Sequence, residues 1–168
     1  KKTMIVQPFP HVIDTLRELH RRGYILGVAS SRNHCSLDGY VKQMQLEDIF
    51  SSIVAGDDVE HVKPAPDMVF KALREMKEMK NPGASAEDVK NPGASAEEVL
   101  NPVTSAEAED IKDVLAETLV VGDMNFDVDM AHHAGCKACA VTYGNGTREQ
   151  LASAEFIIDD FAELLDLV

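Results

Sequence analysis

The chain has 168 residues, of which 45% are hydrophobic and 27% charged, and it carries a formal net charge of −13. A surface this acidic excludes DNA, RNA and anionic membranes as main partners, and no apolar run approaches the roughly 20 residues that a membrane-spanning helix needs. The three cysteines are too few, and odd in number, for a disulfide scaffold, so we expect a reducing, cytoplasmic compartment.

The first half of the sequence predicts helices that alternate with strands. Pro10 opens a helix with its apolar residues on one face, and Gly23 ends it. A short apolar run follows over Tyr24–Ala29, which we expect to be a strand buried on both faces. Next come a helix over about residues 36–45, a strand over Phe50–Ala55 and a helix over Asp67–Met79.

The second half continues the pattern. We expect strands at Leu119–Val121, Ala138–Thr142 and Phe156–Ile158, a helix over Asp127–Ala134 that Gly135 closes, and a final helix through Phe161 and Leu165. Strands that alternate with helices predict an α/β fold, in which helices cover both faces of a parallel sheet.

Residues 81–110 interrupt this alternation with an imperfect ten-residue repeat. Each copy begins with an Asn-Pro turn, at Asn81, Asn91 and Asn101, and continues to a serine that can cap a short helix. Three short copies are too few for a repeat domain with its own core. We therefore expect a surface insertion in a single core domain that spans residues 1–168, and a docking arm for a partner is the functional alternative.

Three short motifs follow predicted strands, where an open parallel sheet binds its ligands. Ser30 and Ser31 come after the first strand and offer hydroxyl and backbone N–H donors to a phosphate. Lys63 lies before two prolines that stiffen its loop, and it can neutralise a phosphoryl group. Each of these two motifs also has an ordinary explanation as a turn.

The third motif is acidic. Asp123 follows the apolar strand that ends at Gly122, and Asp127 opens the next helix. Asp127 could simply cap that helix, but two carboxylates four residues apart at a strand end are suited to Mg²⁺. We therefore expect Mg²⁺ as the cofactor, with Asp123 and Asp127 as its ligands.

The ordered set of Ser30, Lys63-Pro-x-Pro and Gly122-Asp123-x-x-x-Asp127 resembles the second, third and fourth motifs of the haloacid dehalogenase superfamily, in its phosphoglycolate-phosphatase and β-phosphoglucomutase-like branch. The resemblance implies a three-layer Rossmann-like fold and a phosphatase that acts on a small phosphorylated metabolite through an aspartyl-phosphate. It implies that Ser30 and Lys63 are catalytic, that Ser30, Ser31 and Lys63 bind the substrate phosphate, and that Asp123 and Asp127 hold the metal.

One motif of that family has no match here. Its first strand ends in Asp-x-Asp, which supplies the nucleophile and the general acid, and the Asp-x-Asp of this sequence, Asp127–Asp129, already belongs to the acidic motif. The helical cap that follows the first motif is missing too. In the family that first strand is central, so we expect a slot between the strands that begin at Tyr24 and Leu119, with backbone groups that need partners.

Two interpretations stay open. Residue 1 is Lys1 rather than methionine, so the parent protein can be an active hydrolase whose first motif and cap lie upstream. Alternatively, the chain is a non-catalytic pseudoenzyme or structural subunit, in which a partner chain or the segment Lys2–Val6 fills the slot. The sequence does not name the substrate.

Cys136 and Cys139 form a C-x-x-C pair just after two histidines. This spacing can indicate a zinc or redox site, but a closed zinc site needs four ligands and the sequence has no second pair. We expect a turn and a buried strand with no bound metal.

Overall fold

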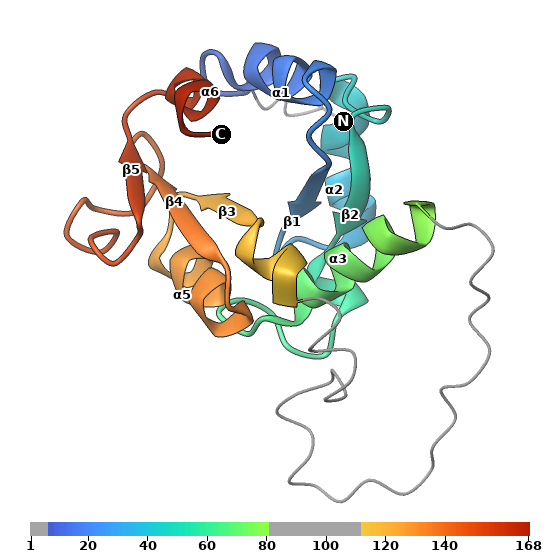
Figure 1. The fold of residues 1–168 in the computed structure, drawn as a ribbon. Helices are drawn as coiled ribbons and strands as arrows, with labels where there is room; N and C mark the ends of the chain where they lie inside the picture. The colour runs from blue at the N-terminus through green and yellow to red at the C-terminus, as the bar shows by residue number, and fades with distance from the viewer. Residues whose placement is uncertain (1–6, 81–111) are drawn as a thin grey trace, which may run out of the picture.

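The computed structural model describes residues 7–80 and 112–168 (Figure 1). The elements before residue 81 are α1 (Val12–Arg21), β1 (Leu26–Ala29), α2 (His34–Gln43), β2 (Phe50–Val54), the 3₁₀ turn η1 (Gly56–Asp58) and α3 (Asp67–Lys80). Those after residue 111 are β3 (Leu119–Gly122), α5 (Asn125–Ala134), β4 (Lys137–Val141), β5 (Phe156–Ile158), η2 (Phe161–Glu163) and α6 (Leu164–Leu167), and residues 112–116 are also helical. The predicted repeat at 81–110 lies outside the described residues.

Local sequence signals account for the helix boundaries. Gly23 and Gly135 follow α1 and α5 with φ values of 89° and 86°, in the left-handed region that favours glycine. The side chain of Asn33 accepts a hydrogen bond from Ser36 N at 2.8 Å and so caps α2. The expected helix ends are therefore confirmed to within a few residues.

The strands form two parallel sheets. One has the order β1-β2, with Ala29 paired to Val54, and the other has the order β3-β4-β5, with Cys139 paired to Val121 on one side and Phe156 on the other. Within the described residues, no ladder joins β1 to β3. The slot expected between these two strands is thus present as a break in the sheet.

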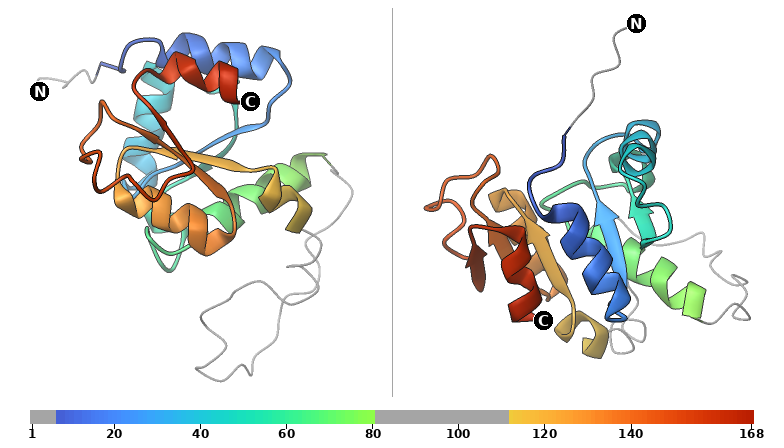
Figure 2. Two further views of the ribbon diagram at one scale, coloured as in Figure 1. Left: turned by 60° about the vertical axis from the view of Figure 1, so that its left-hand side comes forward. Right: turned by 90° about the horizontal axis from the view of Figure 1, so that it is seen from above.

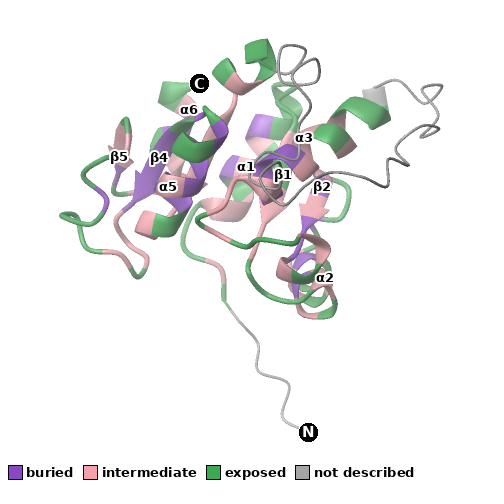
Figure 3. Cartoon of the chain, turned by 90° about the horizontal axis from the view of Figure 1, so that it is seen from below, coloured by how far each residue is buried: buried purple, intermediate pink, exposed green. Residues whose placement is uncertain are grey.

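The expected burial of the first strand is wrong, and the break in the sheet accounts for this. The segment Tyr24–Ala29 was expected to be buried on both faces, but β1 begins only at Leu26, Tyr24 and Ile25 are 41% and 43% exposed, and Gly27 is also exposed. A strand with a neighbour on one side only leaves its other edge uncovered. By contrast, β4 lies between two strands and is buried except for Lys137 (Figure 3).

Helices cover both faces of the strands, which gives three layers (Figure 2). On one face α3 packs on the β1-β2 sheet and α5 on the β3-β4-β5 sheet, and the two helices join in one core cluster that includes Met68 and Val128. On the other face, α1 contributes Leu19 to a cluster with β4 and the C-terminal helix, while α2 packs on β1 and β2. Among the described residues, no helix is long and apolar enough to cross a membrane.

Candidate phosphate and metal site

An ion pair brings together two loops that leave the two different sheets. Lys63, in the segment between β2 and α3, donates from Nζ to Oδ1 of Asp127 at the start of α5, at 2.7 Å. Their side chains are only 18% and 9% exposed. Two of the predicted motifs therefore meet in one partly buried pair past the carboxyl ends of β2 and β3.

Asp127 has a second set of partners. Its Oδ2 accepts from the backbone N–H groups of Asp123 at 3.1 Å and Met124 at 3.0 Å. Gly122 allows the Asp127 side chain to approach the backbone of this turn closely, because a Cβ at position 122 would overlap that side chain. One oxygen of Asp127 therefore accepts from backbone N–H groups in the turn before α5, as the capping explanation expected, and the other faces Lys63.

Asp123 is held by the loop after β4. Its Oδ2 accepts from both the backbone N of Asn145 at 2.8 Å and the side-chain Nδ2 of Asn145 at 3.0 Å. No hydrogen bond to its Oδ1 occurs in the part of the chain that the structure describes. Sequence reasoning missed Asn145, and the signal that could have found it is the Gly144-Asn145-Gly146 turn directly after a buried strand.

Ser30 lies at the end of β1, in a loop fastened to the neighbouring strand. Its backbone N donates to Val54 O at 2.9 Å, and its Oγ accepts from the backbone N of Arg32 at 3.3 Å. Gly56 N in turn donates to Arg32 O at 2.8 Å. Ser31 is exposed. No described hydrogen bond links Ser30 or Ser31 to Lys63, Asp123 or Asp127, so the structure does not join the serines to the ion pair through hydrogen bonds.

His34 adds further hydrogen bonds between the loop after β1 and the turn after β2. Its backbone N donates to Asp57 at 2.8 Å, and its Nδ1 lies 2.7 Å from Oδ2 of Asp58, which also accepts from Ala55 N. The hydrogen bond with Asp58, together with the negative charge of that residue, raises the pKa of His34 above its usual 6.5. Burial works to raise the pKa of Asp58, but the Ala55 N–H and His34 outweigh it and lower that pKa below 3.8.

The described residues contain no group of three or more His, Cys, Asp or Glu side chains that could hold a metal. Mg²⁺ does not need such a cage, because it keeps several waters and is commonly held by one or two carboxylates together with substrate phosphates. Asp123, with one oxygen fixed by Asn145 and the other without a partner, has the chemistry of such a ligand. Asp127 has both oxygens already engaged.

Cys136 and Cys139 are buried free thiols on opposite sides of β4. Cys136 packs in the cluster under α3 and α5, whereas Cys139 packs in the cluster that includes Leu19 of α1. Desolvation by burial raises the pKa of each thiol to about 11, with a smaller effect of Glu163 on Cys139. The two thiols thus belong to different core clusters of the fold.

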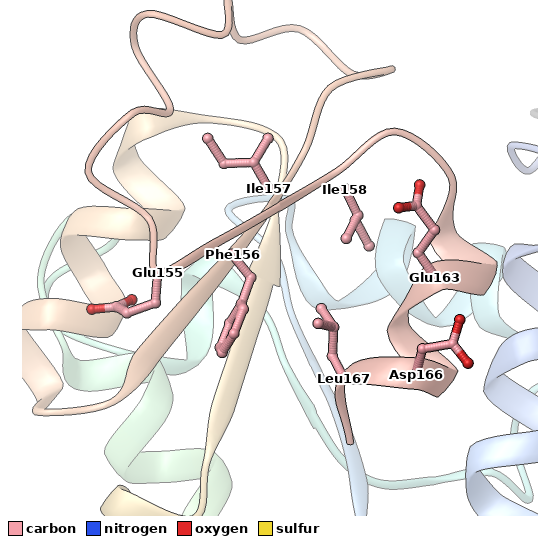
Figure 4. A pocket seen from close by; sticks show the side chains of 7 residues that line it. All are labelled: Glu155, Phe156, Ile157, Ile158, Glu163, Asp166 and Leu167. Carbon is pink, nitrogen blue, oxygen red and sulfur yellow. The ribbon is translucent and has the colours of Figure 1, made fainter.

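A hollow of about 340 Å³ lies between β5 and the C-terminal helix (Figure 4). Phe156, Ile158 and Leu167 contribute its apolar wall, and the carboxylates of Glu163 and Asp166 lie at its border. It shares no residue with the predicted motifs, so it is not part of this site.

The sequence of this chain is similar to the sequences of known proteins. The family model described as haloacid dehalogenase-like hydrolase matches residues 1–98, and a second HAD-hydrolase-like model matches residues 61–164. Pyrophosphatase PpaX from Anoxybacillus flavithermus is 27% identical over 166 residues, and the same enzyme from Bacillus cereus is 26% identical. Each alignment covers 98% of this chain but 61% of the relative, so the chain spans about three fifths of the proteins it matches.

Solved structures agree on the fold. A predicted phosphoglycolate phosphatase from Haemophilus somnus superposes with a TM-score of 0.63 at 23% identity, covering 96% of this chain and 57% of that one. CbbY from Rhodobacter sphaeroides, determined in complex with phosphate, superposes with a TM-score of 0.61 at 26% identity, covering 92% of this chain and 55% of that one.

Proposed function

The chain belongs to the haloacid dehalogenase-like hydrolase family, and from this membership we propose that residues 1–168 form the core domain of a Mg²⁺-dependent phosphohydrolase. Its substrate is a small phosphate monoester, and the phosphoryl group passes to water through an aspartyl-phosphate. The observation that carries the proposal is the meeting of Lys63, Asp127 and Asp123 at the carboxyl ends of β2 and β3.

Each residue of the site has its own role in this proposal. Asp123, whose Oδ1 has no hydrogen bond among the described residues, would hold Mg²⁺, while Asp127 keeps Lys63 in place and would support the metal site. When bound, Mg²⁺ would supply positive charge against the phosphoryl oxygens. Ser30 and Ser31 donate to the non-bridging oxygens from the loop after β1, and the Lys63 ammonium stabilises the negative charge of the phosphoryl group and of the aspartyl-phosphate.

The nucleophile comes from a strand outside this sequence. Lys63 is paired with a carboxylate, so its ammonium has no lone pair to attack phosphorus, and both oxygens of Asp127 are occupied. In this proposal an apolar strand that ends in Asp-x-Asp lies between β1 and β3, since each of these strands has an unpaired edge there within the described residues. Its first carboxylate then forms the bond to phosphorus as the ester P–O bond breaks, and its second protonates the leaving oxygen.

Turnover of a generic phosphate monoester with Mg²⁺ tests this proposal. We expect none from the 168-residue chain alone, and turnover of at least about 1 per second from a longer chain in which an apolar strand ending in Asp-x-Asp precedes Lys1. In the longer chain, Asp123→Ala should remove this activity. An inactive longer chain that still folds would favour the non-catalytic alternative, and undiminished turnover in Asp123→Ala would refute the metal assignment.

A further inference from the structure

Asn145 contacts Asp123 in a way that fixes the orientation of its carboxylate. The backbone N and the side-chain Nδ2 of Asn145 both donate to the same oxygen, Oδ2, at 2.8 and 3.0 Å. Two donors from one residue restrict both the position of that oxygen and the rotation of the carboxylate about its bond to Cβ. The other oxygen, Oδ1, is left without a hydrogen bond among the described residues.

The loop that carries Asn145 is itself held tightly against Asp123. Gly146 N donates to the backbone O of Asp123 at 2.9 Å. A Cβ at Gly144 would overlap the Asp123 side chain, and one at Gly146 would overlap the Asp123 carbonyl oxygen. Leu151, which is fully buried, packs behind Gly146 and anchors the loop. The two glycines therefore permit a close approach that places Asn145 against Oδ2.

The two carboxylates of the acidic motif have partners of different charge, because Asn145 is uncharged whereas Lys63 is cationic. Asp127 faces an ammonium, so its charge is compensated within the protein. Asp123 is held by amide donors alone, and no cationic side chain contacts it in the described part of the chain. The Asp123 carboxylate is thus fixed in position without a cationic partner among the described residues, an arrangement that favours a bound cation there.

From this geometry we infer that Asn145 is a positioning residue, which orients Asp123 so that Oδ1 is presented to a divalent cation. The inference rests on the proposed function, because it assigns the cation to Asp123. It adds a residue that contacts neither the cation nor the substrate and acts only through the Asp123 carboxylate.

Binding of Mn²⁺, a paramagnetic substitute for Mg²⁺, to the whole 168-residue chain provides the test. Titration followed by electron paramagnetic resonance reports the free ion, and Asp123→Asn identifies the part of the binding that belongs to this site. We expect Asn145→Ala to weaken that part about tenfold, since one hydrogen bond to a charged group is lost. The control is Ser153→Ala, which removes an exposed polar group that makes no described hydrogen bond with its side chain and should leave the affinity unchanged.

A second measurement needs no metal. In the unmodified chain, the side-chain amide proton that Asn145 donates to Asp123 should exchange with solvent more slowly than the amide protons of an asparagine without a hydrogen-bond partner, and Asp123→Ala should abolish the difference. Equal Mn²⁺ affinity of the wild type and Asn145→Ala would overturn the inference if Asp123→Asn binds more weakly. If Asp123→Asn binds as well as the wild type, the proposed metal site fails instead. Fast exchange of the Asn145 amide in the wild type would overturn the inference whatever the metal does.

Discussion

Lys63 and Asp127 are 64 positions apart in the sequence, yet Lys63 Nζ and Asp127 Oδ1 are 2.7 Å apart in the fold. This pair connects the segment after the β1-β2 sheet to the first turn of the helix that follows β3. With exposures of 18% and 9%, both charges are largely removed from water. The pair is therefore important for the stability of the chain as well as for the proposed chemistry.

Asp127→Asn should lower the free energy of unfolding by about 3 kcal/mol, because the change leaves a partly buried ammonium without its counter-charge. The double variant with Lys63→Met should recover part of this loss, and a double-mutant cycle from urea unfolding measures the coupling. The control is Lys71→Met, which breaks the more exposed pair with Glu75 and should cost about 0.5 kcal/mol. Equal losses of unfolding free energy for the single variants Lys63→Met and Lys71→Met would show that the Lys63 pair is no stronger than a surface pair.

The contact between His34 and Asp58 should make stability depend on pH. The pKa of His34 is raised in the folded state and that of Asp58 is lowered. The contribution of His34 is therefore fully present below about pH 6.5 and is lost as the pH rises through its folded pKa, while that of Asp58 is lost only below about pH 4.

The melting temperatures of the wild type and His34→Gln should accordingly differ more at pH 5.5 than at pH 8.5. His20→Gln, which changes an exposed histidine on α1, controls for the general effect of removing an imidazole. A difference for His34→Gln that stays constant between the two pH values would contradict this prediction.

The cysteines should differ in reactivity. Cys35 is exposed, whereas Cys136 and Cys139 are buried with pKa values raised to about 11. At pH 8 the buried thiols are almost entirely protonated, and only the thiolate reacts quickly. Iodoacetamide should modify Cys35 alone in the native chain and all three cysteines in urea, as mass spectrometry can show.

Elemental analysis should find no zinc bound to Cys136 and Cys139, and one zinc per chain that is lost in Cys139→Ser would contradict the structural role of the pair.

The slot between β1 and β3 predicts a pattern of amide exchange. In a parallel ladder successive residues face opposite neighbours, and Ser30 N donates to β2. The N–H groups of Val28 and Ser30 should therefore exchange slowly, and those of Gly27 and Ala29 quickly. A peptide with an apolar strand ending in Asp-x-Asp should protect Gly27 and Ala29 selectively, whereas uniform exchange along β1 would show that no ordered edge exists there.

The sequence predicted what depends on local pattern. The strand Phe156–Ile158 has the expected bounds, and Gly23 and Gly135 end the helices they were expected to end. The break in the sheet was also expected, because the missing motif belongs to a central strand of the family. Exposure of Tyr24 and Ile25 was not expected, since an apolar run reads the same whether or not a neighbouring strand is present.

The sequence singled out the residues of the candidate site but not the contacts between them. Lys63, Asp123 and Asp127 lie at the expected edge of the fold, yet the sequence could not show that Asp127 faces Lys63 while Asp123 is left to Asn145. Asn145 is 22 positions from Asp123, and His34 is 24 positions from Asp58. Contacts across such separations depend on how whole elements pack, which neither periodicity nor short motifs encode.

The two separate sheets have a consequence for how copies of the chain behave together in solution. A single five-stranded sheet has two edges, but within residues 7–80 and 112–168 the orders β1-β2 and β3-β4-β5 give four. Exposed edges are templates for pairing between molecules, and the net charge of −13 opposes this by mutual repulsion. Salt weakens that repulsion, so colloidal stability should fall as ionic strength rises, and an inserted strand that removes two edges should make the chain tolerate more salt before it precipitates.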